Sequence, residues 1–177
     1  VEGFLWPRAG HSGAASHRPR DLCLMQVYRL VRKKYANPLS GEGASQFGNR
    51  WNSKGTALIY CAASRALAMA EVAVHLSLGL LPKDYEMVEL EIPSKVSSKS
   101  LALEDLPEGW NSFPPPVNTR QFGDRFILEN VVAVLKVPSV VTPGDFNYLI
   151  NPFHKDISKI RIVSVEDFLF DKRLFKP

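Results

Sequence analysis

Two charged side chains lie inside stretches that are otherwise apolar enough to form a core. Arg29 interrupts the β-forming segment 26–31 (QVYRLV), and Glu71 lies between Ala70 and Val72 in an alanine-rich segment. A buried charge is costly unless it is paired or used. Taken alone, the residues favour a salt bridge between Arg29 and Glu71 at the rim of the core. A functional site that uses both charges is the alternative.

Other polar and aromatic residues have two interpretations each. Arg50 could bind an anion, or it could stack on the tryptophan that follows it. Tyr60 could contact a ligand, or it could be a core tyrosine with a satisfied hydroxyl. Ser139 could act in a site or end a turn. For Asn147 and Asn151 we expect the structural role, bracing of loop backbone.

The familiar cofactor motifs are absent from the sequence. The glycine cluster at residues 41–48 (GEGASQFG) matches neither the dinucleotide-binding fingerprint nor a phosphate-binding loop ending in Gly-Lys-Ser/Thr. Glu71 and His75 are four residues apart, but a second histidine at ligand spacing is missing, so no metal site is expected. Cys23 and Cys61 are too few for a disulfide framework, and we interpret Cys61 as a small buried hydrophobe.

The elements that must position these residues are mixed strands and helices. Strands are predicted, from β-forming or apolar patterns, at residues 26–31, 56–61, 86–92, 131–137 and 159–165, with a loop or short strand around residues 146–149. Ser64 is the expected N-cap of a helix that runs to about Leu78, with Leu67, Ala70, Val74 and Leu78 as its buried stripe. A second helix is predicted at about 119–129, and the proline-rich segment 93–118 is expected to be irregular. Without regular βαβ alternation, this order predicts the α+β class.

Composition limits the class of protein further. A chain of 177 residues with 45% hydrophobic residues is long enough for one domain with a substantial core. Its net charge of +4 is spread along the sequence, which gives no reason to expect direct nucleic-acid binding. No run reaches the roughly 20 apolar residues of a membrane span, so neither a membrane nor a secretory route is expected, and we expect a cytoplasmic protein. Residues 1–24 show no periodicity and are interpreted as a non-native or disordered leader ahead of a domain at 25–177.

Four blocks of the sequence together resemble the RES domain family. They are VYRL at residues 27–30, FGNRWNSKGTALIYCAASRALAMAEVAVHL at 47–76, GDRFILE at 123–129 and VPSVVTPGDFNYLINPFHKD at 137–156. The family is named for an Arg, a Glu and a Ser, which by motif match are Arg29, Glu71 and Ser139. The resemblance implies a single domain similar to ADP-ribosyltransferases, with a mixed β-sheet core and flanking helices. It also implies action on NAD⁺ as a substrate, and an Xre-type antitoxin partner that carries a helix-turn-helix domain.

The resemblance also implies roles for the residues. Glu71 is expected to stabilise the oxocarbenium-like transition state of nicotinamide–ribose cleavage, and Arg29 or Arg50 to bind the pyrophosphate. For the flat nicotinamide ring, a contact with Tyr60 is expected first and one with Tyr28 second. Ser139 is expected to bond the nicotinamide amide or a ribose hydroxyl.

Three functions follow as hypotheses. The first is a toxin that degrades NAD⁺ as a glycohydrolase or phosphorylase, with water or phosphate as acceptor. The second is an ADP-ribosyltransferase that modifies a cellular protein, and the sequence leaves the choice of acceptor open. The third is a non-catalytic binding module or a toxin that acts on nucleic acid, which only the mild positive charge supports.

Overall fold

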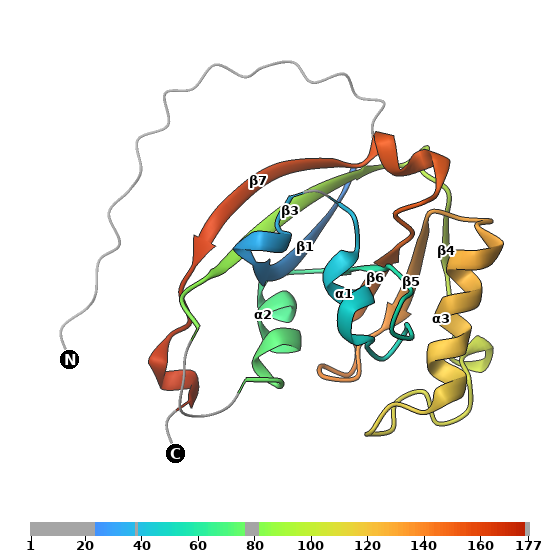
Figure 1. Ribbon diagram of the computed structural model, residues 1–177, viewed down its shortest axis with the longest axis horizontal. Helices are drawn as coiled ribbons and strands as arrows, with labels where there is room; N and C mark the ends of the chain where they lie inside the picture. The colour runs from blue at the N-terminus through green and yellow to red at the C-terminus, as the bar shows by residue number, and fades with distance from the viewer. Residues whose placement is uncertain (1–23, 38, 77–81, 176–177) are drawn as a thin grey trace.

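A single mixed sheet organises the protein (Figure 1). The computed structural model describes residues 24–37, 39–76 and 82–175. In this part of the chain seven strands follow the order β4-β5-β6-β2-β1-β3-β7, with only β4 and β5 parallel. Their bounds are β1 Leu24–Arg32, β2 Ile59–Ala62, β3 Tyr85–Pro93, β4 Ser98–Ser100, β5 Val134–Pro138, β6 Phe146–Ile150 and β7 Arg161–Phe168.

Three α-helices and four short 3-10 turns accompany the described strands. The helices are α1 Glu42–Phe47, α2 Arg65–Ala73 and α3 Val117–Glu129, and the turns are Lys33–Tyr35, Leu103–Asp105, Lys155–Lys159 and Lys172–Phe175. Ser64 caps α2 as expected, since its hydroxyl accepts a hydrogen bond from the Leu67 amide. The last residue of α3 precedes Asn130, which takes the left-handed conformation that commonly ends a helix.

The sheet divides where β1 meets β2. Strand β1 pairs with β3 at nine consecutive positions, but with β2 only at Tyr28 opposite Ala62. Because the two strands share so little of a ladder, the half-sheet β4-β5-β6-β2 diverges from the half-sheet β1-β3-β7. The space between the two halves is where the cleft described below lies.

Neighbouring residues of β1 point to opposite faces of the sheet. Val27 packs in one core cluster with Val88 and Cys61, whereas Leu30 packs with Met87 beneath α2. Arg29 is paired with Val88 and therefore belongs to the first face, the one away from α2. This alternation places Arg29 and the helix that carries Glu71 on different sides of β1.

The structure confirms the α+β class and most of the predicted elements, with three differences. Helix α2 ends at Ala73, so Val74 is 57% exposed instead of buried, and the expected end at Leu78 lies outside the described residues. Neither α1, in the glycine-rich segment, nor the three-residue β4, in the segment expected to be irregular, was predicted. The predicted leader also lies outside the described residues, apart from Leu24, which begins β1. None of the described helices is long and apolar enough to cross a membrane.

Candidate active site

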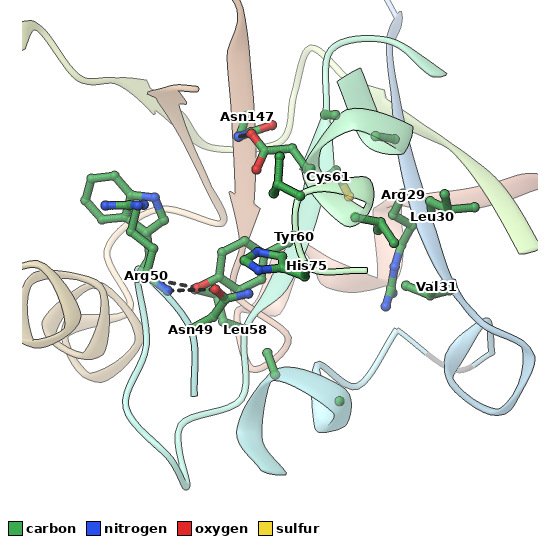
Figure 2. A pocket seen from close by; sticks show the side chains of 18 of the residues that line it. Arg29, Leu30, Val31, Asn49, Arg50, Leu58, Tyr60, Cys61, His75 and Asn147 are labelled. Atoms are coloured by element: carbon green, nitrogen blue, oxygen red, sulfur yellow. Dashed lines mark hydrogen bonds between the residues drawn. The ribbon is translucent and has the colours of Figure 1, made fainter. Parts of the chain in front are cut away.

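A cleft of about 970 Å³ opens between the two half-sheets (Figure 2). Five of the six residues expected in a site line it: Tyr28 and Arg29 from β1, Arg50 from the loop after α1, Tyr60 from β2 and Glu71 from α2. In the close view Arg29 and Arg50 lie on opposite sides, with Tyr60 and His75 between them. The lining therefore combines cations, aromatic rings and a carboxylate. Such a set suits a ligand with both anionic and planar parts.

Glu71 is held by two side chains from the far half-sheet. The Ser139 hydroxyl donates to Glu71 Oε1 at 2.7 Å, and the Asn147 amide donates to the same oxygen at 2.5 Å. Helix α2 brings the carboxylate, while the two donors follow β5 and begin β6. The carboxylate is thus oriented by contacts that span three elements.

Ser139 lies behind Glu71 and does not line the cleft. Its side chain is buried, and its oxygen accepts hydrogen bonds from the amides of Val141 and Thr142 at 3.1 and 3.0 Å. The Ser139 amide donates to the Asp145 carbonyl at 2.9 Å. Ser139 therefore closes a turn, in agreement with the structural interpretation, and directs its only hydroxyl proton to Glu71 instead of into the cleft, where the expected contact with the nicotinamide amide or a ribose hydroxyl would lie.

Arg29 is buried, but it does not form the salt bridge with the Glu71 carboxylate that the sequence suggested. Only 8% of the residue is exposed, and no residue in the described part of the chain accepts a hydrogen bond from its Nε or Nη1. Burial lowers the pKa of the Arg29 guanidinium, and the nearby Cys61 only partly offsets this effect. The predicted salt bridge with Glu71 is wrong, because the two residues lie on different sides of β1 and Glu71 is bonded to Ser139 and Asn147. A buried guanidinium with free donors beside a cleft is suited to an anionic ligand.

Arg50 holds a loop with one end of its guanidinium. Its Nη1 donates to the carbonyls of Trp110 and Ser112 at 2.6 and 2.9 Å. The sequence offered stacking of Arg50 on Trp51 as an alternative. Among the described residues, the guanidinium of Arg50 makes no such contact with the Trp51 ring. Trp51 is instead buried against Trp110, with ring centroids 6.2 Å apart. Burial lowers the pKa of Arg50, and the charge of Glu71 acts in the opposite direction.

The two tyrosines expected at the site both line the cleft. The Tyr60 hydroxyl accepts from the Trp51 amide at 3.0 Å and donates to Asn52 Oδ1 at 2.8 Å. Burial raises the pKa of Tyr60 well above its usual range. The satisfied hydroxyl agrees with the structural interpretation, yet the half-buried ring remains part of the cleft wall. Tyr28 is half-buried beside the cluster that packs under α2.

Sequence reasoning missed the contact of Asn147 with Glu71. The expectation that Asn147 braces loop backbone is wrong, since its side-chain amide donates to the Glu71 carboxylate and Asn147 lines the cleft. For Asn151 the same expectation is confirmed: it donates to the Ile127 carbonyl and accepts from the Phe153 amide. A sequence signal for this contact was available in the alternation of residues 146–149, which form β6. Asn147 pairs with Ala62 of β2, and Ala62 is also the residue at which β2 pairs with β1 and the half-sheets separate.

His75 and Cys61 both line the cleft. His75 is exposed in the turn after α2, where it lines the cleft. Cys61 is buried, as predicted, and burial raises the pKa of its thiol to about 12. Among the described residues, no group of three or more His, Cys, Asp or Glu side chains is arranged to hold a metal ion. Cys23 lies outside this part of the chain.

The protein is an α+β domain with a carboxylate and a buried arginine in the lining of one cleft. The profile of the RES domain matches residues 26–171, and the chain belongs to this family. The "Prs ADP-ribosylating toxin" of Sphingobium sp. (strain YBL2) is 41% identical over 148 residues, 82% of this chain and 92% of that protein. A protein named "Toxin Res" from Yersinia enterocolitica is 36% identical over 85% of this chain and 99% of its own length.

A solved structure supports the fold independently. A chain from the crystal structure of the M. tuberculosis MbcT–MbcA toxin–antitoxin complex superposes with a TM-score of 0.65. The match covers 87% of this chain and 88% of the other, at 18% sequence identity. At that identity the likeness concerns the arrangement of the sheet and helices.

Proposed function

We propose that this protein is a toxin that cleaves the bond between nicotinamide and ribose in NAD⁺. The observation that carries the proposal is that one cleft contains both a carboxylate held by two donors and a buried arginine whose Nε and Nη1 have no hydrogen-bond partner among the described residues. The kinship with proteins named as toxins, one of them ADP-ribosylating, supports both the toxic role and the use of NAD⁺.

Each residue has a chemical task in this proposal. The C1′–N bond breaks with its electron pair leaving on nicotinamide, whose ring thereby loses its positive charge. Positive charge develops on the ribose, and the carboxylate of Glu71 stabilises it. Arg29 binds the pyrophosphate through its free Nε and Nη1. The ring of Tyr60, or second that of Tyr28, supports the nicotinamide, and Arg50 adds a cation at the other side.

Two acceptors for the ADP-ribose are compatible with this site. With water, the products are nicotinamide, ADP-ribose and a proton; with phosphate, ADP-ribose bears a phosphate at C1″. We favour degradation of NAD⁺ by one of these routes. The second candidate is transfer to a cellular protein, which the name of the Sphingobium relative favours. Labelled NAD⁺ distinguishes them, because transfer leaves label on a protein and degradation leaves it in a small molecule.

A protein partner is part of the proposal. An enzyme that consumes NAD⁺ harms its own cell, and a structural neighbour was crystallised as a toxin–antitoxin complex. We infer that an antitoxin, of the Xre type with a helix-turn-helix domain, inhibits this protein. Co-purification of an inhibitor encoded beside it, with loss of nicotinamide release in the complex, is the expected result.

The decisive test is nicotinamide release from NAD⁺ by the purified protein, with and without phosphate. Glu71→Gln keeps the shape of the side chain but removes its charge, and we expect a loss of rate of about 100-fold to 1,000-fold. The matched control is Glu91→Gln, which removes a buried carboxylate that pairs with Arg161 and does not line the cleft. Equal rates for wild type and Glu71→Gln would contradict the proposed role.

A further inference from the structure

Both donors to Glu71 converge on a single carboxylate oxygen. Oε1 accepts from Ser139 and from Asn147, while Oε2 accepts from no residue in the described part of the chain. A carboxylate held in this way has one oxygen fixed by the protein and the other available in the cleft that Glu71 lines. Short bonds to a charged acceptor are among the stronger hydrogen bonds in proteins, so the orientation is well defined.

The chemistry of the groups fixes how the Asn147 amide is turned. An ionised carboxylate only accepts hydrogen bonds, so the side facing it must be the amide nitrogen. With the nitrogen on Glu71, the amide oxygen points elsewhere, and no described residue donates to it. The side-chain amide of Asn147 thus donates a hydrogen bond to Glu71 and makes no other hydrogen bond in the described chain.

Asn147 also differs from Ser139 in its position. Strand β6 lies between β2 and β5, and Asn147 is in register with Ala62 on one side and with Val137 on the other. Asn147 lines the cleft, whereas Ser139 is buried behind it. The backbone of Asn147 is held by strands on both sides, and its side-chain amide bonds a carboxylate on a separate helix. A donor on such a rigid mount can orient the carboxylate precisely.

We propose that Asn147 is a positioning residue for the reaction in this cleft. It fixes Glu71 Oε1 together with Ser139, so that Oε2 faces the ribose on which positive charge develops. This inference rests on the proposed function. It adds a residue whose side chain is not one of the three for which the RES family is named.

The first test separates turnover from binding. Asn147→Ala leaves Glu71 with one donor, and we expect kcat for nicotinamide release to fall about tenfold to a hundredfold, the range for one lost bond to a charged group. The KM for NAD⁺ should change by less than about threefold, because the pyrophosphate contacts are untouched. A wild-type kcat in the folded Asn147→Ala variant overturns the inference.

The second test uses a pH dependence that a merely structural residue would not produce. Asn147→Asp has nearly the same shape but offers an acceptor to Glu71 at neutral pH, where the two carboxylates repel each other. As the pH falls, the introduced carboxyl group gains a proton and becomes a donor again. The ratio of variant to wild-type kcat should therefore rise as the pH is lowered from 8 towards 5, a range chosen to bracket this protonation.

The control is Asn151, the buried asparagine that follows the same strand and braces backbone. Asn151→Asp should lower stability but give a kcat ratio that is flat with pH. A flat ratio for Asn147→Asp, or the same rising ratio for Asn151→Asp, overturns the inference. Should Asn147→Ala fail to fold, the isosteric Asn147→Asp carries the test.

Failure of the proposed function gives a different pattern. A wild-type protein that releases no nicotinamide contradicts the proposed function, and the inference with it. An active wild type with an inactive Glu71→Gln variant, but with unaltered kcat and pH ratio for the Asn147 variants, overturns the inference alone.

Discussion

Arg29 is a buried cation whose hydrogen-bonding capacity is only partly satisfied by the protein. Its guanidinium is buried, and two of its three nitrogens have no hydrogen-bond partner within residues 24–37, 39–76 and 82–175. Each unsatisfied buried donor costs about 1–3 kcal/mol. The neighbouring Cys61 cannot compensate, since burial also disfavours its thiolate. An anionic ligand would supply the missing acceptors, and the unliganded fold bears the cost.

Replacing Arg29 by methionine should stabilise the protein and lower its activity. The substitution removes an uncompensated buried charge and keeps an unbranched apolar side chain of similar length, so we expect the free energy of unfolding to rise by about 1–3 kcal/mol. Nicotinamide release should fall at least tenfold because the pyrophosphate loses its cation. Thermal unfolding and the release assay measure the two effects.

The matched control for Arg29 is Arg161→Met. Arg161 is exposed and pairs with the buried Glu91 at 3.0 Å, so its removal leaves a buried carboxylate without its partner. Stability should fall and the rate per folded molecule should stay unchanged. A destabilised Arg29→Met protein would show that Arg29 is a structural residue.

At the scale of elements, the loop that carries Arg50 is fixed from several sides. Asn52 is fully buried, and its amide nitrogen lies within hydrogen-bonding distance of three backbone carbonyls, one in α1 and two in the following turn, while its oxygen accepts from Tyr60. The Ser53 amide donates to Asp124 of α3 at 2.9 Å. This network places Arg50 and the Tyr60 ring at the cleft and makes α3 a support of the site.

Gly123 permits the close approach of α3 to this loop. A Cβ at this position would lie 1.7 Å from the Trp51 carbonyl oxygen. Gly123→Ala would gain about 1 kcal/mol of helix propensity, but an overlap of that size forces backbone apart. We expect a net loss of about 1–3 kcal/mol, the usual cost of overpacking. Urea unfolding measures it.

The control for Gly123→Ala is Gln121→Ala on the same helix, at an exposed position. It should change stability by less than about 0.5 kcal/mol. Nicotinamide release should fall in Gly123→Ala and not in Gln121→Ala, because only the former displaces the loop of Arg50. Unaltered stability in Gly123→Ala would mean that α3 and the loop separate easily.

At the scale of the whole molecule, the end of the sheet around β4 and β5 is tied together by a carboxylate. Asp156 accepts from the amide and hydroxyl of Ser97 and pairs with Lys159 at 2.6 Å. The Ser97 hydroxyl in turn accepts from the Ala133 amide. Three segments that are distant in sequence meet here. Lys159 and then Ser97 hold the pKa of Asp156 well below its ordinary value.

This carboxylate should make stability sensitive to acid. Because its folded-state pKa is lowered, its contribution is fully present above the pKa of the unfolded chain, about 4, and is lost progressively as the pH falls below that value towards the lowered pKa of the folded state. Asp156→Asn should reduce stability at pH 7 and flatten its decline between pH 5 and 3. Chemical unfolding as a function of pH measures both, and an equally steep decline in the variant would contradict the assignment.

The sequence determined much of the architecture because local patterns encode it. Alternation and β-branched residues located β1 and β3, the Ser64 cap located the start of α2, and the odd charges drew attention to Arg29 and Glu71. Helix α1 and strand β4 were not predicted from the sequence, because both are short and their residues are glycine-rich or polar. The end of α2 was placed too late, since an apolar residue such as Val74 continues a pattern even where the helix stops.

Only the tertiary structure decided how the site is assembled. Arg29 lies on the side of β1 away from α2, and Glu71 is bonded to Ser139 and Asn147, so the expected salt bridge does not form. Ser139 and Asn147 meet Glu71 only because β5, β6 and α2 converge, although they lie 68 and 76 residues from it in sequence. Residue type and spacing can propose which groups do chemistry. The partner of each group depends on strand order and divergence, which are set by long-range packing and cannot be read from local sequence.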